Sequence, residues 1–394
     1  MSGNLLSHSN SFGFEMEKDA AGCRALNRNF IVGGDIVLNV CITFDYELFL
    51  GKNNAPYKEI LFAPTDNLIR TLSEKGVSGT FFADVCSVDA HHRLGNEKYC
   101  EDFTLQLQSM VLNNQDVQLH LHPSWLYAEK KDGQIVLSNK GYRLHEFGFG
   151  NGGKASQIIR DGISYLENTC RTYNSDYKCV AYRAGGFSVQ PEQALFSTLI
   201  KNGIRIDSSV VPHMYTKEAN AYDFTKVPAD LNWWIDPDKG ISCNSNQTSQ
   251  TIFEVPVATV RPRIMQVIGK RRSELGLPPN KVLGEYVKSD CPPKKQNAII
   301  KQYHRLRDYR YVSLDTRYYL RVMEDLEYIY RKYGMDEQDG YVCLICHPKL
   351  ADECRVMNIA HLIDEIRKVP ERFALVNFSD IYKNEVETKE RKNG

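Results

Sequence analysis

The chain has 394 residues, a length that suits one barrel-type domain with insertions. Hydrophobic residues make up 42% of it and charged residues 25%, which is ordinary for a water-soluble globular protein. Lys plus Arg and Asp plus Glu number 49 each, so no global field attracts nucleic acid. No apolar run approaches the roughly 20 residues that a membrane span needs.

The N-terminal and cysteine patterns predict a reducing compartment. Residues 1–34 are polar and without period, which predicts a flexible lead-in. They lack a basic start followed by an apolar core, so no signal peptide is expected. The eleven cysteines are scattered, and Cys343 and Cys346 would point to opposite faces of a strand rather than share a metal. We therefore expect a cytoplasmic protein.

From residue 35 onward, short β-rich runs alternate with stretches of helical spacing. The expected strands are 35–44, 78–85, 116–122, 178–183, 205–211, 252–260, 341–347 and 372–378. The expected helices are 64–75, 99–113, 155–173, 191–202, 314–333 and 358–368. This rhythm predicts an α/β fold with a parallel sheet, helices outside it and a domain covering 35–394.

Two segments interrupt the rhythm. Residues 141–154 are rich in glycine and aromatic residues and predict a loop at the mouth of a site. Residues 261–340 are basic at first and then helical and Tyr-rich, which predicts a largely helical insertion. Its basic residues could hold a phosphorylated or lipid-linked glycan, although the pattern favours a solvated charged face. These residues are Lys270, Arg271, Arg272, Lys294 and Lys295.

Polar, reaction-capable residues stand at the ends of five of the apolar runs. The five segments are TFDYE at 43–47, HLHP at 120–123, YRAGG at 182–186, DSS at 207–209 and CHP at 346–348. Barrels carry their chemistry at the carboxyl ends of their strands. The order of the segments therefore predicts one metal-assisted active site.

The first two segments carry groups that suit a metal ion. Asp45 and Glu47 stand two apart, so both carboxylates leave the same face of a strand. One could bind a divalent ion while the other takes a proton from water. His120 and His122 repeat this spacing, a common way to hold zinc. The simpler interpretation of Asp45 and Glu47 is a solvated acidic loop edge, and that of the histidines is packing in the core.

The remaining segments offer groups that orient or move a proton. Arg183 suits the orientation of a carboxylate base, and Gly185 and Gly186 let the backbone approach a ligand. Asp207 could pair with Arg183 or a histidine, or form a turn. His347 ends the most apolar run, and an ordinary histidine pKa of about 6.5 suits a general acid.

The motifs TFDYE, HLHPSW, YRAGGF, DSSV and LICHP resemble, in order, those of the polysaccharide deacetylases of the nodulation-protein type, the family-four carbohydrate esterases. The resemblance covers about residues 36–380. It is strongest with a bacterial branch linked to lipopolysaccharide and surface-glycan biosynthesis. The resemblance implies a distorted (β/α) barrel of about seven strands and a divalent metal, usually zinc.

The resemblance also implies roles for individual residues. Asp45 stands at the position of the catalytic base, Arg183 at that of the residue orienting it, and His347 at that of the general acid. Tyr46 replaces the second Asp of the family motif, which leaves Glu47 as the candidate ligand. His120 matches the first histidine ligand. The second is replaced by Ser124, so His122 is the available substitute.

The implied reaction is the attack of an activated water on the acetamide carbon of an N-acetylated sugar, after which His347 protonates the departing amine. The partner would be a surface polysaccharide or a lipid-linked or nucleotide-linked precursor. We expect several residues to line the substrate site, with aromatic rings stacking on sugar faces. These residues are Tyr46, Trp125, Gly185, Gly186, Trp233 and Trp234.

Two other functions fit the same residues. One is a metal-dependent amidase acting on a non-sugar or cyclic amide, because a fold does not fix a substrate. The other is a non-catalytic glycan-binding barrel, which the Tyr46 and Ser124 replacements favour. The complete set of Asp45, Arg183 and His347 argues against it, because a binding protein needs no proton-transfer groups. A homo-oligomer is compatible with all three.

Overall fold

The computed structural model describes residues 37–50, 52–53, 56–137, 140–150, 152–262, 308–333 and 340–388. The expected lead-in at 1–34 and most of the expected insertion, including its five basic residues, lie outside these ranges.

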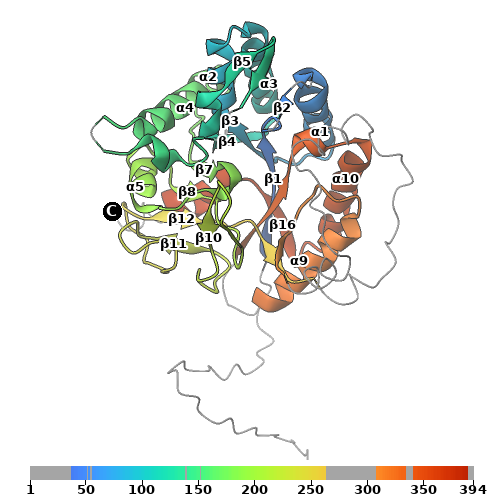
Figure 1. Ribbon diagram of the computed structural model, residues 1–394. Helices are drawn as coiled ribbons and strands as arrows, with labels where there is room; N and C mark the ends of the chain where they lie inside the picture. Colours follow the sequence, from blue (N-terminus) through green and yellow to red (C-terminus); the bar gives the residue numbers. More distant parts are fainter. Residues whose placement is uncertain are drawn as a thin grey trace, which may run out of the picture. The chain divides into compact units, whose positions relative to one another are not determined.

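A ring of parallel strands forms the centre of the protein (Figure 1). In spatial order the ring contains β12 (Ile252–Glu254), β8 (Ile206–Asp207), β7 (Ala181–Ala184), β4 (Asp116–Leu121), β3 (Thr80–Asp84), β1 (Leu38–Tyr46) and β15 (Gly340–Cys346). A parallel bridge between Val257 and Cys343 joins the chain after β12 to β15 and closes the ring. The expected α/β barrel of about seven strands is confirmed.

Two further strands extend this sheet. The strand β16 (Phe373–Val376) pairs with the first half of β1, while β3 pairs with the second half. The strand β11 (Trp233–Ile235) runs antiparallel to β12. Small sheets outside the ring are formed by β2 (Lys52–Asn53), β5 (Glu129–Lys131) and β6 (Gln134–Val136), by β9 (Tyr215–Thr216) and β10 (Tyr222–Asp223), and by β13 (Thr259–Val260) and β14 (Arg310–Tyr311).

Helices cover the outside of the ring (Figure 1). They are α1 (Ala63–Glu74), α2 (Val85–Arg93), α3 (Glu97–Leu112), α4 (Ala155–Cys170), α5 (Gln193–Lys201), α9 (Tyr319–Tyr333), α10 (Glu353–Arg367) and α11 (Phe378–Ile381). Short 3₁₀ and π turns are η1 (Lys58–Phe62), η2 (Pro123–Tyr127), η3 (Leu144–Phe147), η4 (Gly185–Phe187), η5 (Pro348–Leu350) and η6 (Tyr382–Glu387). None of the helices within the described ranges is long and apolar enough to span a membrane.

The pattern of apolar residues explains the central elements. All residues of β3, β4 and β15 are buried, as expected for strands covered by helices on one side and by the barrel interior on the other. In α4, Ile159, Ile163 and Leu166 recur at helical spacing and are buried.

Some boundaries differ from the expected ones. The expected strand 252–260 is divided into β12 and β13, with Pro256 between them, because proline cannot donate to a sheet ladder. The helix expected at 358–368 already begins at Glu353, where the Asp352 side chain accepts a hydrogen bond from the backbone N–H of Arg355. The helix α2 is not among those expected, because its short polar sequence has no extended apolar stripe.

The register of the strands aligns their carboxyl ends. Asp84 at the end of β3 lies opposite His120 of β4, and His120 lies opposite Arg183 of β7. Phe44 of β1, one residue before Asp45, lies opposite Cys346, one residue before His347. Asp207 of β8 lies opposite Tyr182 of β7, one residue before Arg183. All five sequence motifs therefore meet at one end of the barrel.

Candidate active site

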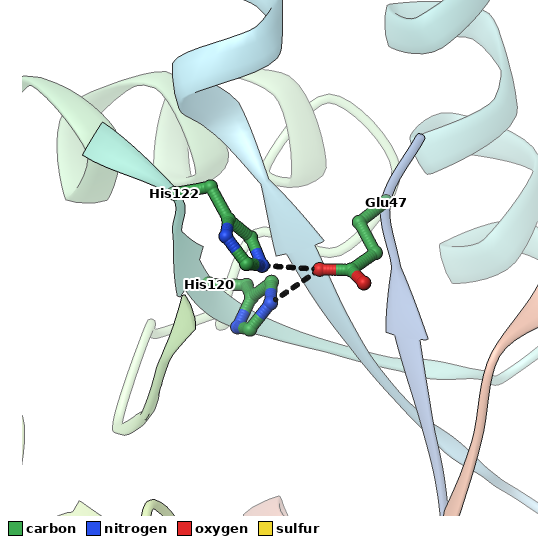
Figure 2. A group of neighbouring side chains, drawn as sticks. All are labelled: Glu47, His120 and His122. Carbon is green, nitrogen blue, oxygen red and sulfur yellow. Dashed lines mark hydrogen bonds and ion pairs between the residues drawn. The ribbon is translucent and has the colours of Figure 1, made fainter. Parts of the chain in front are cut away.

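Glu47, His120 and His122 form a buried group of potential metal ligands (Figure 2). One oxygen atom and two nitrogen atoms, one from each residue, all lie within 4.8 Å of one another. Glu47 follows β1, whereas His120 belongs to β4 and His122 stands directly after it. Alternation along the strand sends both imidazoles to the same side, where they face Glu47.

The contacts within this group fit a cation. His120 Nδ1 lies 2.8 Å from the Arg183 carbonyl, so it carries a proton, and its Nε2 lies 3.0 Å from Glu47 Oε2. His122 Nε2 contacts the same oxygen without hydrogen-bond geometry and is otherwise buried and unpartnered. One ion between the three atoms would satisfy both imidazoles at once. Two imidazoles and one carboxylate are also the donors of zinc sites that keep a position open.

Lys349 holds the other oxygen of Glu47. Its Nζ lies 2.8 Å from Glu47 Oε1, while Oε2 faces the imidazoles. Burial by itself would raise the pKa of Glu47, but the Lys349 ammonium and the two imidazoles outweigh it and hold this pKa well below its ordinary value. Glu47 is therefore an anion, the form that binds a metal.

Asp45 is paired with Arg183 at the end of β1. Arg183 Nη1 donates to Asp45 Oδ1 at 2.5 Å, and the Arg183 side chain is completely buried. The guanidinium also lies over the Phe82 ring, 4.0 Å from its centre. Arg183 keeps its proton under all physiological conditions, so it fixes the orientation of the Asp45 carboxylate.

The donors of Arg183 are all engaged. Nε donates to the Ser208 carbonyl at 3.1 Å, and Nη1 also donates to Thr43 Oγ1 at 3.0 Å. Nη2 donates to Ser208 Oγ and to Cys343 Sγ, each at 3.0 Å. Because a guanidinium has five N–H donors, this arrangement leaves the side chain no other orientation that satisfies them all.

His347 lies beside Asp45 and is held by Asp315. Its Nδ1 lies 2.8 Å from Asp315 Oδ2, and its backbone N–H donates to Asp315 Oδ1 at 2.8 Å. Burial lowers the pKa of His347, but the Asp315 carboxylate more than reverses this effect and, with Asp45 and Glu47, raises it to about 9. His347 Nε2 lies 3.9 Å from Asp45 Oδ2. The imidazole, a proton donor, and the carboxylate, a proton acceptor, therefore lie on the same side of the site.

Asp207 makes the local contacts of a turn, one of the expected alternatives, rather than a hydrogen bond to Arg183 or a histidine. Its side chain accepts hydrogen bonds from Ser209 Oγ at 2.7 Å and from the Ser209 backbone N–H at 3.1 Å. Its remaining side-chain partner is the carboxyl group of Glu254 in β12, and not Arg183 or a histidine. Within this segment it is Ser208, the next residue, that contacts Arg183, because neighbouring residues of a strand point to opposite sides.

The aromatic residues expected at the mouth are buried elsewhere. Tyr46 is fully buried, and its hydroxyl donates to Gln106 at 2.7 Å. Trp125 is fully buried beside His91, and Trp233 donates its indole N–H to the Ile241 carbonyl. Trp234 is also buried. The burial of these rings gives no support to the expectation that they stack on a sugar, which stays a prediction.

The two glycines after Arg183 serve packing. A Cβ atom at Gly185 would come within 2.6 Å of His122 Nδ1 and 2.5 Å of the Leu121 carbonyl, so only glycine leaves room for the His122 ring. Gly186 adopts a φ of +58° beside Asn220, whose side chain donates to its carbonyl. The structure therefore gives a packing reason for each glycine, and the expectation that they lie beside a substrate stays a prediction.

Several site residues were not foreseen from the sequence. Asp315 lies in the stretch that reads as an insertion, and Lys349 follows a motif already explained by His347. Asp84 at the end of β3 accepts the His122 backbone N–H at 3.0 Å, and its position at a strand end is the one signal that could have revealed it. Its second oxygen is buried without a hydrogen-bond partner.

No protein-family model matches the chain, and no curated protein matches it. Among solved structures, the chain is similar to a protein from Mycobacterium smegmatis described as a polysaccharide deacetylase. The two share 13% sequence identity over 91% of this chain and 94% of that chain, with a TM-score of 0.46.

Two other solved structures show a similar relationship. Puue allantoinase shares 9% identity over 89% of this chain and 90% of its own, with a TM-score of 0.46. The peptidoglycan deacetylase PdaC from Bacillus subtilis shares 10% identity over 92% of this chain and 98% of its own, with a TM-score of 0.33. Similarity at this level says nothing about the function of this chain.

Proposed function

We propose that this protein is a metal-dependent hydrolase that removes N-acetyl groups from an N-acetylated sugar in a surface polysaccharide or its precursor. The observation that carries the proposal is that three groups meet at one end of the barrel. They are the paired Asp45 and Arg183, the Glu47–His120–His122 group and the paired His347 and Asp315. Together they supply a base, a cation site and an acid, which is the set that amide hydrolysis requires.

Asp45 is the proposed base. Arg183 holds one of its carboxylate oxygens, and the other lies toward His347 and can accept a proton from an attacking water. A divalent ion bound by Glu47, His120 and His122 would polarise the amide carbonyl and stabilise the negative charge that develops on its oxygen.

His347 is the proposed acid. A pKa of about 9 keeps its imidazole protonated at neutral pH, so it can protonate the amine nitrogen as the C–N bond breaks. Asp315 fixes the ring so that Nδ1 faces Asp315 and Nε2 faces Asp45. Asp45 takes one proton from the attacking water, and His347 gives one proton to the leaving amine, so the two proton transfers balance.

The experiment is an acetate-release assay with zinc-loaded protein and N-acetylglucosamine oligomers. The Asp45→Asn variant should keep its circular dichroism spectrum and lose at least 10²-fold in kcat, because a positioned base contributes roughly 10²–10⁴-fold. Asp161→Asn, on the outer face of α4, is the matched control and should behave as wild type. Acetate release by Asp45→Asn at the wild-type rate would remove Asp45 from the mechanism.

A non-sugar amide is the second candidate. The burial of Tyr46, Trp125 and Trp233 gives no support to the expected aromatic platform for a sugar, whereas the base, acid and cation site suit any amide. Parallel assays with allantoin, a cyclic amide, and with N-acetylglucosamine oligomers distinguish the two. Turnover of allantoin without acetate release would favour the second candidate.

A further inference from the structure

Lys349 is a buried cation at the candidate metal site. It belongs to η5, two residues after His347, and only 7% of its surface is exposed. Its ammonium donates to Glu47 Oε1 at 2.8 Å and to the Leu48 carbonyl at 3.1 Å. It also lies 5.0 Å from the centre of the Phe49 ring. A lysine is rarely buried to this degree unless it is paired.

The contact with Lys349 determines how Glu47 meets the imidazoles. Because Oε1 is held by the ammonium, only Oε2 faces His120 and His122, and Figure 2 shows the second oxygen turned away from both rings. Glu47 can therefore offer a metal one oxygen atom rather than two. This leaves more of the ion's coordination positions for water and substrate.

Lys349 also changes the charge of the site. Asp45 is paired with Arg183, Asp315 with His347, and Glu47 with Lys349. Each of these three carboxylates thus has a positive partner from the protein, whereas Asp84 accepts the His122 backbone N–H and has a second, buried oxygen without a hydrogen-bond partner. A divalent ion that binds to Glu47 gains the attraction of one carboxylate but meets the repulsion of a nearby ammonium, and such repulsion is strong where water is excluded.

We propose that Lys349 is a positioning residue that provides the counter-charge of Glu47 when no metal is bound and thereby weakens the binding of a divalent ion. This inference rests on the metal site of the proposed function. Removal of Lys349 has two opposed effects: Glu47 loses a positioning contact, and the incoming ion loses a repulsion. We expect the second effect to be larger. The repulsion between the Lys349 ammonium and a divalent ion on the other side of the buried Glu47 carboxylate exceeds the net contribution of the one hydrogen bond that Lys349 donates to Glu47.

The test is the dissociation constant for Zn²⁺, measured by competition with a chromophoric chelator after the protein has been stripped with EDTA. Lys349→Met should bind Zn²⁺ at least 10-fold more tightly than wild type. After stripping it should melt at a lower temperature, and added zinc should raise its Tm more than that of wild type. Lys368→Met is the matched control and should bind as wild type, because Lys368 is an exposed lysine that directly follows α10 and pairs with Glu365.

The charge-conserving variant keeps the test decisive if Lys349→Met does not fold. Lys349→Arg retains a cation beside Glu47 and should bind Zn²⁺ within threefold of wild type. Equal or weaker binding by Lys349→Met, or a tenfold change with Lys349→Arg, overturns the inference while leaving the metal site intact. Failure of wild type to bind Zn²⁺ at all, with no difference from Glu47→Gln, overturns the metal site and this inference together.

Discussion

At the scale of single residues, the properties of the candidate site come from the partners of its charged groups. His347 would be an ordinary histidine without Asp315, and Asp45 would be a mobile carboxylate without Arg183. Both partners are far from these residues in the sequence. The resulting shifts in pKa and orientation give the groups separate roles as acid and base.

The pairing of His347 with Asp315 predicts the alkaline limb of the pH profile. The Asp315 carboxylate raises the pKa of His347 to about 9, so activity should fall as pH rises through that value and the ring loses its proton. In Asp315→Asn the pKa should return toward about 6.5, its ordinary value, and the alkaline limb of kcat/KM should move to lower pH. Profiles of wild type, Asp315→Asn and the surface variant Asp364→Asn measure this. An unchanged limb in Asp315→Asn would exclude His347 as the acid.

The close packing of Gly185 on His122 predicts the result of adding one methyl group. Gly185→Ala should push the His122 ring from its place, because the new Cβ would come within 2.6 Å of Nδ1. We expect a loss of at least tenfold in Zn²⁺ affinity, measured by chelator competition. Gly150→Ala is the control, since a Cβ there meets no atom within 4 Å. Wild-type affinity in Gly185→Ala would show that His122 does not bind the ion.

At the scale of elements, the first turn of helix α10 contacts the segment that contains Asp315, the partner of His347. Asp352 caps the helix by accepting the Arg355 backbone N–H at 3.0 Å, and its other carboxylate oxygen accepts from the Arg355 side chain at 2.9 Å. Arg355 in turn donates to the Asp315 carbonyl at 2.8 Å. The first turn of α10 therefore holds the segment that orients His347.

This arrangement predicts a stability change with an accompanying kinetic one. Asp352→Ala should lower the free energy of unfolding by about 1 kcal/mol, the usual effect of losing a helix cap. It should also lower kcat more than it changes KM, because Asp315 loses part of its support. Urea unfolding and steady-state kinetics measure the two effects. Glu365→Ala, in the last turns of the same helix, is the control for a general loss of helix stability.

At the scale of the whole molecule, buried titratable groups make stability depend on pH. Burial raises the pKa of Glu254 well above its ordinary value, and the neighbouring Asp207 carboxyl raises it further. A carboxyl whose pKa is raised by folding binds its proton more tightly in the folded state. Glu254 therefore lowers the free energy of unfolding progressively as pH rises above about 4.3, the ordinary pKa of Glu.

His347 acts in the same direction at higher pH. Its folded pKa of about 9 exceeds the ordinary value of about 6.5, so its stabilising effect is complete below pH 6.5 and is lost as pH rises through 9. We expect the free energy of unfolding to decrease from pH 5 to pH 9. Glu254→Gln should weaken this decrease and be more stable than wild type at pH 9, as measured by urea unfolding. A wild-type stability that rises over this interval would contradict the assignment of both groups.

Much of the fold was predictable because each central strand is a short apolar run followed by a turn or helix signal. The runs ending at Asp45, His122, Arg183 and His347 were each placed correctly, since strands covered on both sides must be apolar throughout. The helix α2 was not placed, because its short sequence carries no extended periodic stripe. The division of β12 from β13 was also missed, although Pro256 between them is a signal that the sequence contains.

The sequence by itself determined the barrel, the motif order and the approach of Asp45, Glu47, His120, His122, Arg183 and His347, because parallel strands bring their carboxyl ends to one edge. Only the tertiary structure decided which partner each of them has. Lys349 on Glu47, Asp315 on His347 and Ser208 rather than Asp207 on Arg183 depend on distances between remote segments. The same holds for the burial of Trp125 and Trp233, because an aromatic residue after a strand can turn toward the core or the solvent without any change in local sequence.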